Sequence, residues 1–218
     1  MVESVAISRI HFPVTTLGPG HRIGIWFQGC SIRCPGCIST DTWDRNGESV
    51  PFVELWNVID NFARDADGVT ITGGEPFDQA DALRELLHGL RTRLSPIADV
   101  LVYSGFSSSV LAERLHEMTG LIDAIISEPF DAEAPQTQAL MGSDNQRLHF
   151  LTPLGERRFH SYRRPRNTED DRLDLIVDSD GTGWLAGIPK RGDLEHLRRQ
   201  LAADGTFVRT SEQRTTPS

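Results

Sequence analysis

The feature that most constrains the fold is a repeated alternation between short apolar segments and amphipathic segments. Apolar runs typical of strands occur at residues 5–11, 22–27, 68–72, 97–103 and 121–126. Between the later runs, apolar residues stand at helical spacing in segments 51–64, 78–90 and 107–118. Asp78 is a suitable N-cap for the second of these segments. This alternation, four times over, predicts a parallel sheet with helices packed outside it.

In a parallel sheet the loops that follow the strands meet at one edge, and this edge usually carries the chemistry. Three predicted strand exits hold residues of interest. They are the loop with Cys30, Cys34 and Cys37, the loop that starts at Gly73-Gly74, and the loop Tyr103-Ser104-Gly105. We therefore expect these three loops to converge.

Beyond residue 126 the pattern changes. Residues 146–151 are expected to form one more strand, residues 173–178 and 184–188 a hairpin around the turn 179–183, and residues 193–201 a short helix. Residues 206–218 are expected to be a frayed tail. The polar segment 153–172 is expected to be a long surface loop. It contains five arginines, which are Arg157, Arg158, Arg163, Arg164 and Arg166. These arginines form either a solvated face or a docking patch for an acidic protein or a phosphorylated substrate.

The charge and composition of the chain exclude several kinds of binding partner and cell compartment. The net charge is −9, which argues against a nucleic-acid or membrane-surface binder. No apolar run approaches the roughly 18 residues of a membrane helix, and the first residues lack the basic-then-apolar pattern of a signal peptide. The three cysteines are odd in number and clustered, which excludes a disulfide framework. We expect a cytoplasmic protein that binds neither membrane nor nucleic acid.

The three cysteines, the only ones in the chain, have the spacing C-x3-C-x2-C. Thiolates suit zinc or an iron–sulfur cluster. Structural zinc needs four ligands, and His21 lies nine residues before the first cysteine, so only folding could bring it close. A [4Fe–4S] cluster held by three thiolates would instead leave one iron open to a small molecule. Gly29, Pro35 and Gly36 allow the tight turning that a cluster loop needs.

This cysteine loop resembles the signature of the radical S-adenosylmethionine superfamily. A second mark of that superfamily, a G-G-E-P-like stretch after the next strand, is similar to Gly73-Gly74-Glu75-Pro76. The resemblance implies that the three cysteines hold a [4Fe–4S] cluster and that S-adenosylmethionine binds its open iron. It also implies that the stretch 73–76 contacts the methionine end of this cofactor, where Glu75 or a backbone carbonyl would accept from the ammonium group.

A narrower resemblance is to the activating proteins of anaerobic ribonucleotide reductase. Gly36 stands where most superfamily members have an aromatic residue, and the matching stretches are "GCSIRCPGC", "TWD" followed by Gly47, "YSGF", "IDAIISEPF" and "GSDNQ". The resemblance covers roughly residues 10–151. It implies an α/β fold, an open partial (β/α) barrel of the radical S-adenosylmethionine type, and a large glycyl radical enzyme as partner, with a reductant such as flavodoxin or ferredoxin.

Several residues in these stretches have two interpretations. Tyr103 and Ser104 are either contacts on the ribose side of the cofactor or, for the serine, an ordinary strand-end cap. Asn145 and Gln146 are either cofactor contacts or turn residues. Arg33 either tunes the cluster potential through its charge or is simply solvated.

The chain departs from compact activating proteins in two ways. It continues for about 65 residues past Leu151, and Ser39 and Thr40 stand near the place where an asparagine is common. We expect a radical S-adenosylmethionine core over 1–152, the polar loop over 153–172, a C-terminal β-hairpin plus helix extension over 173–205 and the tail. Two alternatives remain: the same chemistry on another peptide, protein or small molecule, and a non-catalytic zinc or electron-transfer module.

Overall fold

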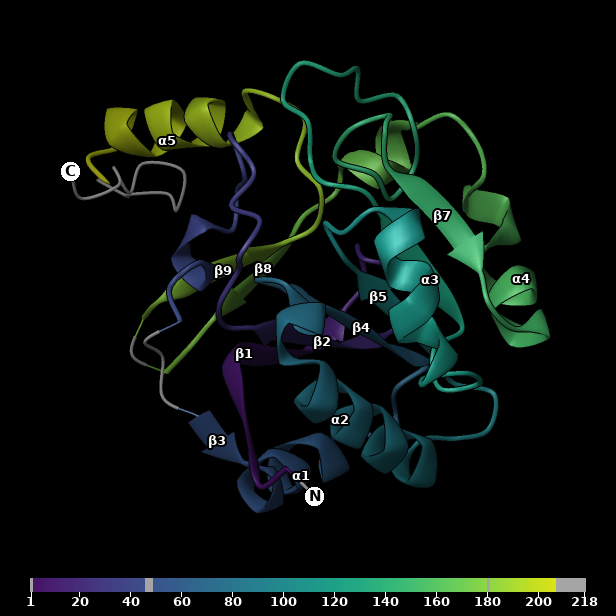
Figure 1. Ribbon diagram of the computed structural model, residues 1–218. Helices are drawn as coiled ribbons and strands as arrows, with labels where there is room; N and C mark the ends of the chain where they lie inside the picture. Colours follow the sequence, from purple (N-terminus) through teal and green to yellow (C-terminus); the bar gives the residue numbers. More distant parts are fainter. Residues whose placement is uncertain (1, 46–48, 180, 207–218) are drawn as a thin grey trace.

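The structure is a computed structural model that describes residues 2–45, 49–179 and 181–206 of the 218-residue chain. Gly47, Asp180 and residues 207–218, which include most of the expected tail, lie outside the described residues. Figure 1 shows a central sheet with helices packed around it and a small hairpin against the N-terminal strands.

The central sheet has seven strands in the order β3-β1-β2-β4-β5-β6-β7. Their bounds are β1 Ser4–Val14, β2 Arg22–Phe27, β3 Ser49–Pro51, β4 Gly68–Gly73, β5 Asp99–Tyr103, β6 Ala124–Ser127 and β7 Arg147–Phe150. Strands β2, β4, β5 and β6 run parallel, while β1, β3 and β7 pair antiparallel with their neighbours. The predicted parallel sheet is confirmed as the centre of a mixed α/β fold, and β3 and β7 form its two edges.

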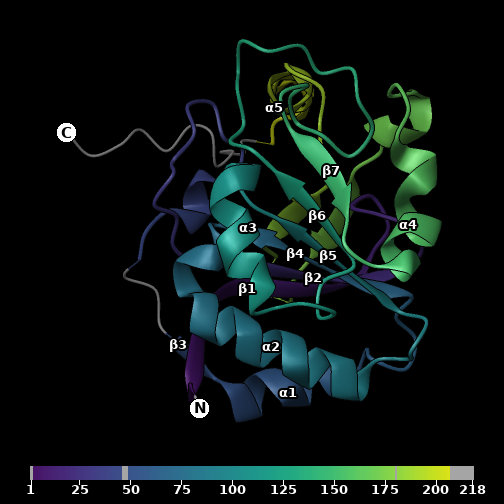
Figure 2. The same cartoon turned by 45° about the vertical axis from the view of Figure 1, so that its right-hand side comes forward.

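Three helices cover one face of the sheet, as Figure 2 shows: α1 Phe52–Asp60, α2 Ala80–Arg93 and α3 Ser108–His116. The alternate residues Ile23, Ile25 and Phe27 of β2 turn toward these helices and join the main core. The opposite face carries two smaller cores. One packs against α4 Pro153–Phe159, and the other packs against the hairpin of β8 Asp174–Val177 and β9 Gly183–Ala186.

Helix α2 begins at Ala80, so Asp78 does not cap it as expected. Asp78 lies in a short 3-10 turn, Pro76–Gln79, that precedes the helix. Its carboxylate accepts hydrogen bonds from Ser31 in the cysteine loop instead. The Asp78 carboxylate therefore makes a tertiary contact with the cysteine loop in place of a cap on helix α2.

The polar segment 153–172 is not the expected surface loop. It forms α4 and two 3-10 turns, His160–Tyr162 and Thr168–Asp171. The hydroxyl of Thr152 accepts from the backbone N–H of Gly155 at 3.1 Å and caps the helix. Gly155 sits directly on the backbone of Asp123, and the side chain of Phe159 is fully buried. The buried ring of Phe159 and the close contact of Gly155 with Asp123 therefore hold this otherwise polar segment against the sheet.

The arginines of this segment are mostly used inside the chain. Arg158 pairs with the buried Asp99 at 2.8 Å, and Arg164 and Arg166 pair with Asp170 and Asp171. Arg163 lies over the ring of Phe150 at 4.0 Å. These four arginines therefore have partners within the chain and do not form a free basic patch.

The hairpin and helix of the C-terminal extension are confirmed as β8, β9 and α5 Asp193–Ala203. The hairpin packs on β1. The carboxylate of Asp174 accepts from the backbone N–H and hydroxyl of Thr15 at 2.6 and 2.8 Å. The guanidinium of Arg9 lies between the rings of Trp26 and Trp184, 5.2 and 4.5 Å from their centroids. Among the described helices, none is both long and apolar enough to pass through a bilayer.

Candidate functional site

The three predicted loops converge at the carboxyl ends of β2, β4 and β5. The backbone N–H of Gly74 donates to the carbonyl of Phe27 at 2.8 Å, and that of Glu75 donates to the carbonyl of Gly29 at 2.8 Å. The backbone N–H of Gly105 donates to the carboxylate of Glu75 at 2.8 Å. The loop after β4 therefore lies between the cysteine loop and the loop after β5, and it is bonded to both.

The glycines after β4 are needed because the two backbones nearly touch. A Cβ on Gly73 would lie 2.5 Å from the backbone nitrogen of Phe27, and one on Gly74 would lie 2.1 Å from the carbonyl oxygen of Gly29. Gly73 also has a φ of +103°, which side chains rarely tolerate. Contact with the cysteine loop itself therefore requires glycine at both positions.

The cysteine loop is held at both ends by backbone hydrogen bonds. Gly29 donates to the carbonyl of Thr42 at 2.7 Å, and Cys30 donates to the carbonyl of Trp43 at 3.1 Å. Within the loop, the N–H of Cys37 donates to the carbonyl of Cys34 at 3.1 Å. All three cysteines are half-buried. The loop is a closed arc with its base on the sheet and its sulfur atoms partly accessible.

The thiols influence one another. Burial is the main cause that raises the pKa of Cys30, Cys34 and Cys37, and like charge on the neighbouring thiols raises the pKa of Cys34 and Cys37 further. Backbone N–H groups of Arg33 and Ser39 point at the sulfur atoms of Cys30 and Cys37, at 3.5 and 3.4 Å. Such donors stabilise thiolate ligands in iron–sulfur sites.

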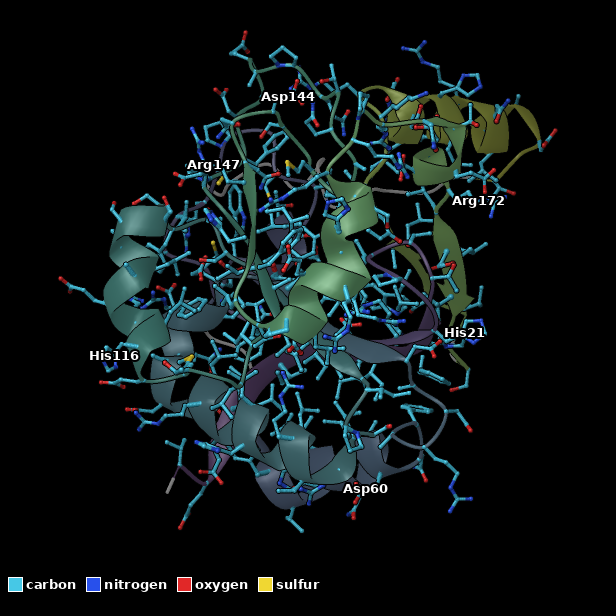
Figure 3. All side chains as sticks on the ribbon, turned by 90° about the vertical axis from the view of Figure 1, so that its right-hand side faces the viewer. His21, Asp60, His116, Asp144, Arg147 and Arg172 are labelled. Carbon is cyan, nitrogen blue, oxygen red and sulfur yellow. The ribbon has the colours of Figure 1, made fainter. Side chains whose placement is uncertain are left out.

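The donor set is three thiolates on one short loop, the ligand type that iron–sulfur clusters use, with each thiolate on a different iron. Among the residues that the structure describes, no group of three His, Cys, Asp or Glu side chains is arranged to hold one metal ion. His21 precedes β2 and Cys30 follows it, so the length of a strand separates them. Figure 3 shows His21 far from Arg147, which lies at the end of the molecule where the loops exit.

Glu75 is almost fully buried, with 1% of its surface exposed. Its carboxylate accepts three hydrogen bonds, from the N–H of Phe77 at 3.0 Å, the hydroxyl of Ser104 at 2.9 Å and the N–H of Gly105. Burial raises the pKa of this carboxyl to about 7, and the three donors oppose the shift. Pro76, also buried, starts the 3-10 turn that follows. The side chain of Glu75 thus ties two site loops together.

Ser104 and Tyr103 point in different directions. Ser104 is buried, donates to Glu75 and accepts from the N–H of Phe106 at 3.1 Å, so it belongs to the site loops. The hydroxyl of Tyr103 donates to the carbonyl of Leu140 at 3.0 Å, and its ring packs with the core beneath α4. Burial raises the pKa of Tyr103 far above its usual range. Of the two, Ser104 is placed with the other site residues.

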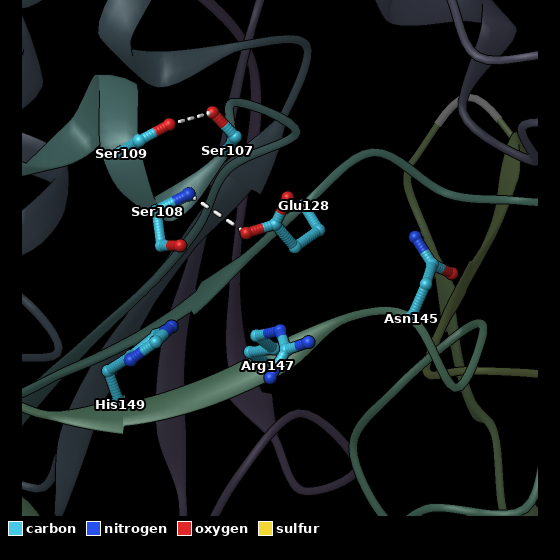
Figure 4. A pocket seen from close by; sticks show the side chains of 7 residues that line it. All are labelled: Ser107, Ser108, Ser109, Glu128, Asn145, Arg147 and His149. Carbon is cyan, nitrogen blue, oxygen red and sulfur yellow. Dashed lines mark hydrogen bonds between the residues drawn. The ribbon is translucent and has the colours of Figure 1, made fainter.

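A polar groove of about 590 Å³ lies beside the start of α3 and is shown in Figure 4. Its lining residues come from the start of α3 and the residue before it, from the residue after β6, and from β7 and the turn before it. They are Ser107, Ser108, Ser109, Glu128, Asn145, Arg147 and His149. Asn145 donates to the carbonyl of Pro129 at 2.8 Å, and Gln146 accepts from the N–H of Gly142 at 2.8 Å. Both side chains make turn contacts, and only Asn145 lines the groove.

Sequence reasoning missed two groups of residues at this edge. Glu128 follows β6 with a φ of +79° and accepts from the N–H of Ser108 at 2.9 Å, and His149 contacts Ser127 at 3.0 Å. The sequence did carry a signal for Glu128, because this residue directly follows a buried strand and so lies at the edge where the site loops meet. The second group is Asp78 with Ser31, for which the sequence offered no signal beyond a carboxylate near a helix start.

Comparison with known proteins is consistent with this geometry. Residues 16–149 match the family model described as the 4Fe-4S single cluster domain. The chain is 28% identical over 135 residues to the anaerobic ribonucleoside-triphosphate reductase-activating protein of Enterobacteria phage T4, which covers 60% of this chain and 85% of that protein. It is 25% identical over 150 residues to the protein of the same name from Escherichia coli K12, covering 65% and 96%.

A more local likeness is to the pyruvate formate-lyase-activating enzyme of Listeria monocytogenes. The two chains are 35% identical over 82 residues, which is 33% of this chain and 31% of that enzyme.

Proposed function

The chain belongs to the family described as the 4Fe-4S single cluster domain, and on this premise we propose that it is a radical S-adenosylmethionine enzyme that activates a glycyl radical enzyme. The relatives are named as activating proteins of anaerobic ribonucleoside-triphosphate reductase and of pyruvate formate-lyase. These names support an activase, and the first of them supports anaerobic ribonucleotide reductase as the partner.

The observation that carries the proposal is the pair of backbone hydrogen bonds that join the two signature loops. The bonds from Gly74 to Phe27 and from Glu75 to Gly29 hold the G-G-E-P stretch against the residue before Cys30. A zinc or electron-transfer module would have no need for this second loop. Two loops held in contact at the exits of neighbouring parallel strands support one shared site for a cluster and a small molecule.

In this site Cys30, Cys34 and Cys37 would hold the [4Fe–4S] cluster. Bound there, the cluster would supply the electron for reductive cleavage of S-adenosylmethionine to methionine and a 5′-deoxyadenosyl radical, the species that would take a hydrogen atom from the substrate. The donors from Arg33 and Ser39 stabilise the thiolate ligands.

The remaining site residues bind and orient the cofactor. We assign the backbone of Gly73, Gly74 and Pro76 to the methionine end, which lies beside the cysteine loop. The carboxylate of Glu75 orients this backbone, because it also holds Ser104 and the N–H of Gly105 on the ribose side. In this assignment Tyr103 supports the site from the core beneath it.

The partner is expected to be a large protein. We propose that the sheet is part of the open barrel of radical S-adenosylmethionine enzymes, in which a partner must cover the site and keep water away from a reactive radical. The substrate is then a glycine of that partner, and a flavodoxin or ferredoxin supplies the electron. The division of the chain into a core over 1–152 and an extension over 173–205 belongs to the same proposal.

The first test is anaerobic reconstitution with iron and sulfide. The protein should turn brown, bind about four irons per chain, and release methionine and 5′-deoxyadenosine when it is reduced in the presence of S-adenosylmethionine. Cys34→Ala should lose both the cluster and the cleavage, while the surface variant Asp81→Asn should keep them. A colourless protein that binds zinc and cleaves nothing would contradict the proposal.

The second test separates the activase from other radical enzymes. The reduced, reconstituted protein is mixed with S-adenosylmethionine and a purified anaerobic ribonucleotide reductase from the same source. Electron paramagnetic resonance should show a glycyl radical signal that splits differently when glycine is deuterated at the α-carbon. Cofactor cleavage without that signal on any glycyl radical enzyme of the source would favour another peptide, protein or small molecule as substrate.

A further inference from the structure

A single carboxylate connects the cysteine loop to the turn after the G-G-E-P stretch. Asp78 lies in the 3-10 turn Pro76–Gln79, and its side chain is 11% exposed. One carboxylate oxygen accepts from the backbone N–H of Ser31 at 2.7 Å, and the other accepts from the hydroxyl of the same residue at 2.7 Å. Ser31 directly follows Cys30, so both bonds act on the residue next to the first ligand.

The same carboxylate reaches the far end of the loop. The guanidinium of Arg45 donates to Asp78 at 2.8 Å, and the aliphatic part of its side chain lies 3.1 Å from the position of a Cβ on Gly29. The next residue of the turn, Gln79, accepts from the N–H of Ala6 at 2.9 Å and donates to the carbonyl of Gln28 at 3.0 Å. The side chains of Asp78 and Gln79, successive residues of one turn, therefore hold the start of the cysteine loop by hydrogen bonds; this set of contacts is called the grip below.

The arc between Cys30 and Cys34 depends on this grip. Ser31 is exposed, Arg33 is exposed and has a φ of +50°, and the N–H of Arg33 points back to the sulfur of Cys30. The bonds from Ser31 to Asp78 connect the arc to the turn after β4, and the side chain of Ile32 lies against Gly105. A charge-assisted hydrogen bond is stronger than a neutral one, which suits a carboxylate to this position.

We propose that Asp78 is a positioning residue that holds Ser31, fixes Cys30 for the cluster and lowers the reduction potential of that cluster by its negative charge. The inference rests on the proposed cluster site. The charge lies beside the ligand, since the carboxylate of Asp78 accepts from the backbone N–H of Ser31, the residue that follows Cys30. A nearby anion disfavours the more negative, reduced form of a cluster. Arg45 offsets this weakly, because its side chain is 60% exposed.

Two substitutions separate the geometry from the charge. In Asp78→Asn the side-chain oxygen can still accept from the N–H of Ser31, and the amide can donate to the Ser31 hydroxyl, so the grip survives without the charge. In Asp78→Ala both are lost. Asp81→Asn is the matched control, because Asp81 lies three residues later on the surface, where its exposed side chain pairs with Arg84.

The experiment measures iron loss to a chelator and the midpoint potential of the reconstituted cluster, without S-adenosylmethionine or a partner. Asp78→Ala should lose iron about tenfold faster than the wild type. Asp78→Asn should lose iron near the wild-type rate while its potential moves to a more positive value. Asp81→Asn should match the wild type in both. The positioning role would be overturned if Asp78→Ala lost iron at the wild-type rate, or if the Asn and Ala variants lost iron at the same rate. An unchanged midpoint potential in Asp78→Asn would overturn the effect of charge.

A measurement on the metal-free full chain keeps the test independent of the cluster. Hydrogen–deuterium exchange of the peptide that covers residues 29–37 should be faster in Asp78→Ala and close to wild type in Asp78→Asn. Exchange that is unchanged in Asp78→Ala would contradict the grip on Ser31. If exchange behaves as expected but the wild type binds no iron, the proposed function fails while the contact between Asp78 and Ser31 stands.

Discussion

The hydroxyl of Ser104 donates to the buried carboxylate of Glu75 at 2.9 Å, and this contact joins the exits of β4 and β5. The two residues are 29 positions apart in the chain. Because Glu75 also accepts from Phe77 and Gly105, its carboxylate satisfies three donors within the site. The glutamate of the G-G-E-P stretch is therefore a structural connector of the site loops, whatever else it contacts.

Substitution of Glu75 should destabilise the protein. Glu75→Ala leaves three donors without a partner, and an unpaired buried donor costs about 1–3 kcal/mol. We expect the free energy of unfolding in urea to fall by about 3 kcal/mol or more. Ser104→Ala, which removes one of the three donors, should lower it by about 1 kcal/mol. The exposed Ser109→Ala is the control, and a Glu75→Ala variant as stable as this control would refute the connector role.

The stability of the metal-free protein should depend on pH through Glu75. Burial raises the pKa of this carboxyl from 4.5 to about 7 in the folded state. The folded protein therefore binds more protons than the unfolded chain between these values, and the free energy of unfolding should fall as pH rises from 4.5 to 7. The full change is about 3 kcal/mol. Urea titrations across this range should show the Glu75 contribution as a more negative slope in the wild type than in Glu75→Gln, because His11 and His149, whose pKa values burial lowers, contribute equally to both proteins.

Gly74→Ala should separate the two signature loops. The added Cβ would lie 2.1 Å from the carbonyl oxygen of Gly29, so one of the loops must move. We expect about tenfold less cluster retained after reconstitution, measured as iron per chain. Gly183→Ala is the matched control, since its Cβ would meet only Leu175 Cδ1 at 3.8 Å. Full iron in Gly74→Ala would show that the backbone contact is dispensable.

The buried ion pair at the other end of the sheet should dominate stability. Arg22 and Asp99 are both fully buried and pair at 2.6 Å. Arg22→Ala removes the fully buried partner of Asp99 and leaves this carboxylate with the partly exposed Arg158, so we expect a loss of about 3 kcal/mol. Arg158→Ala removes a partly exposed partner while Asp99 keeps Arg22, so we expect a loss of about 1 kcal/mol. Chemical denaturation of both variants measures the difference, and equal losses would contradict this ranking.

Much of the sheet was predictable because buried parallel strands are apolar and bounded by glycine or polar residues. Strand β2 matches the expected range, and the convergence of three strand exits followed from the parallel order. Arg22 shows the limit of such reasoning. A charged residue at the start of a strand suggests a surface position, and only the pairing with Asp99, 77 residues later, makes its burial possible.

The missed features share a physical cause. Asp78 has the local pattern of a helix cap, and Pro153–Phe159 has the composition of a loop. In both cases a contact with a distant segment, Ser31 for the first and Asp123 for the second, determines the structure. Propensity and periodicity describe neighbours in the chain, so they carry no information about such contacts.

The contact of Asp174 with Thr15 also has a consequence for how the chain is made. It joins residues 159 positions apart, and the hairpin that contains Asp174 covers the face of the sheet that holds Val14 and Trp26. During synthesis β1 and β2 leave the ribosome before the hairpin does, and their outer face has no cover until the hairpin follows. Folding of this face is therefore completed only after the hairpin has been translated, and the nascent protein exposes an apolar surface until then.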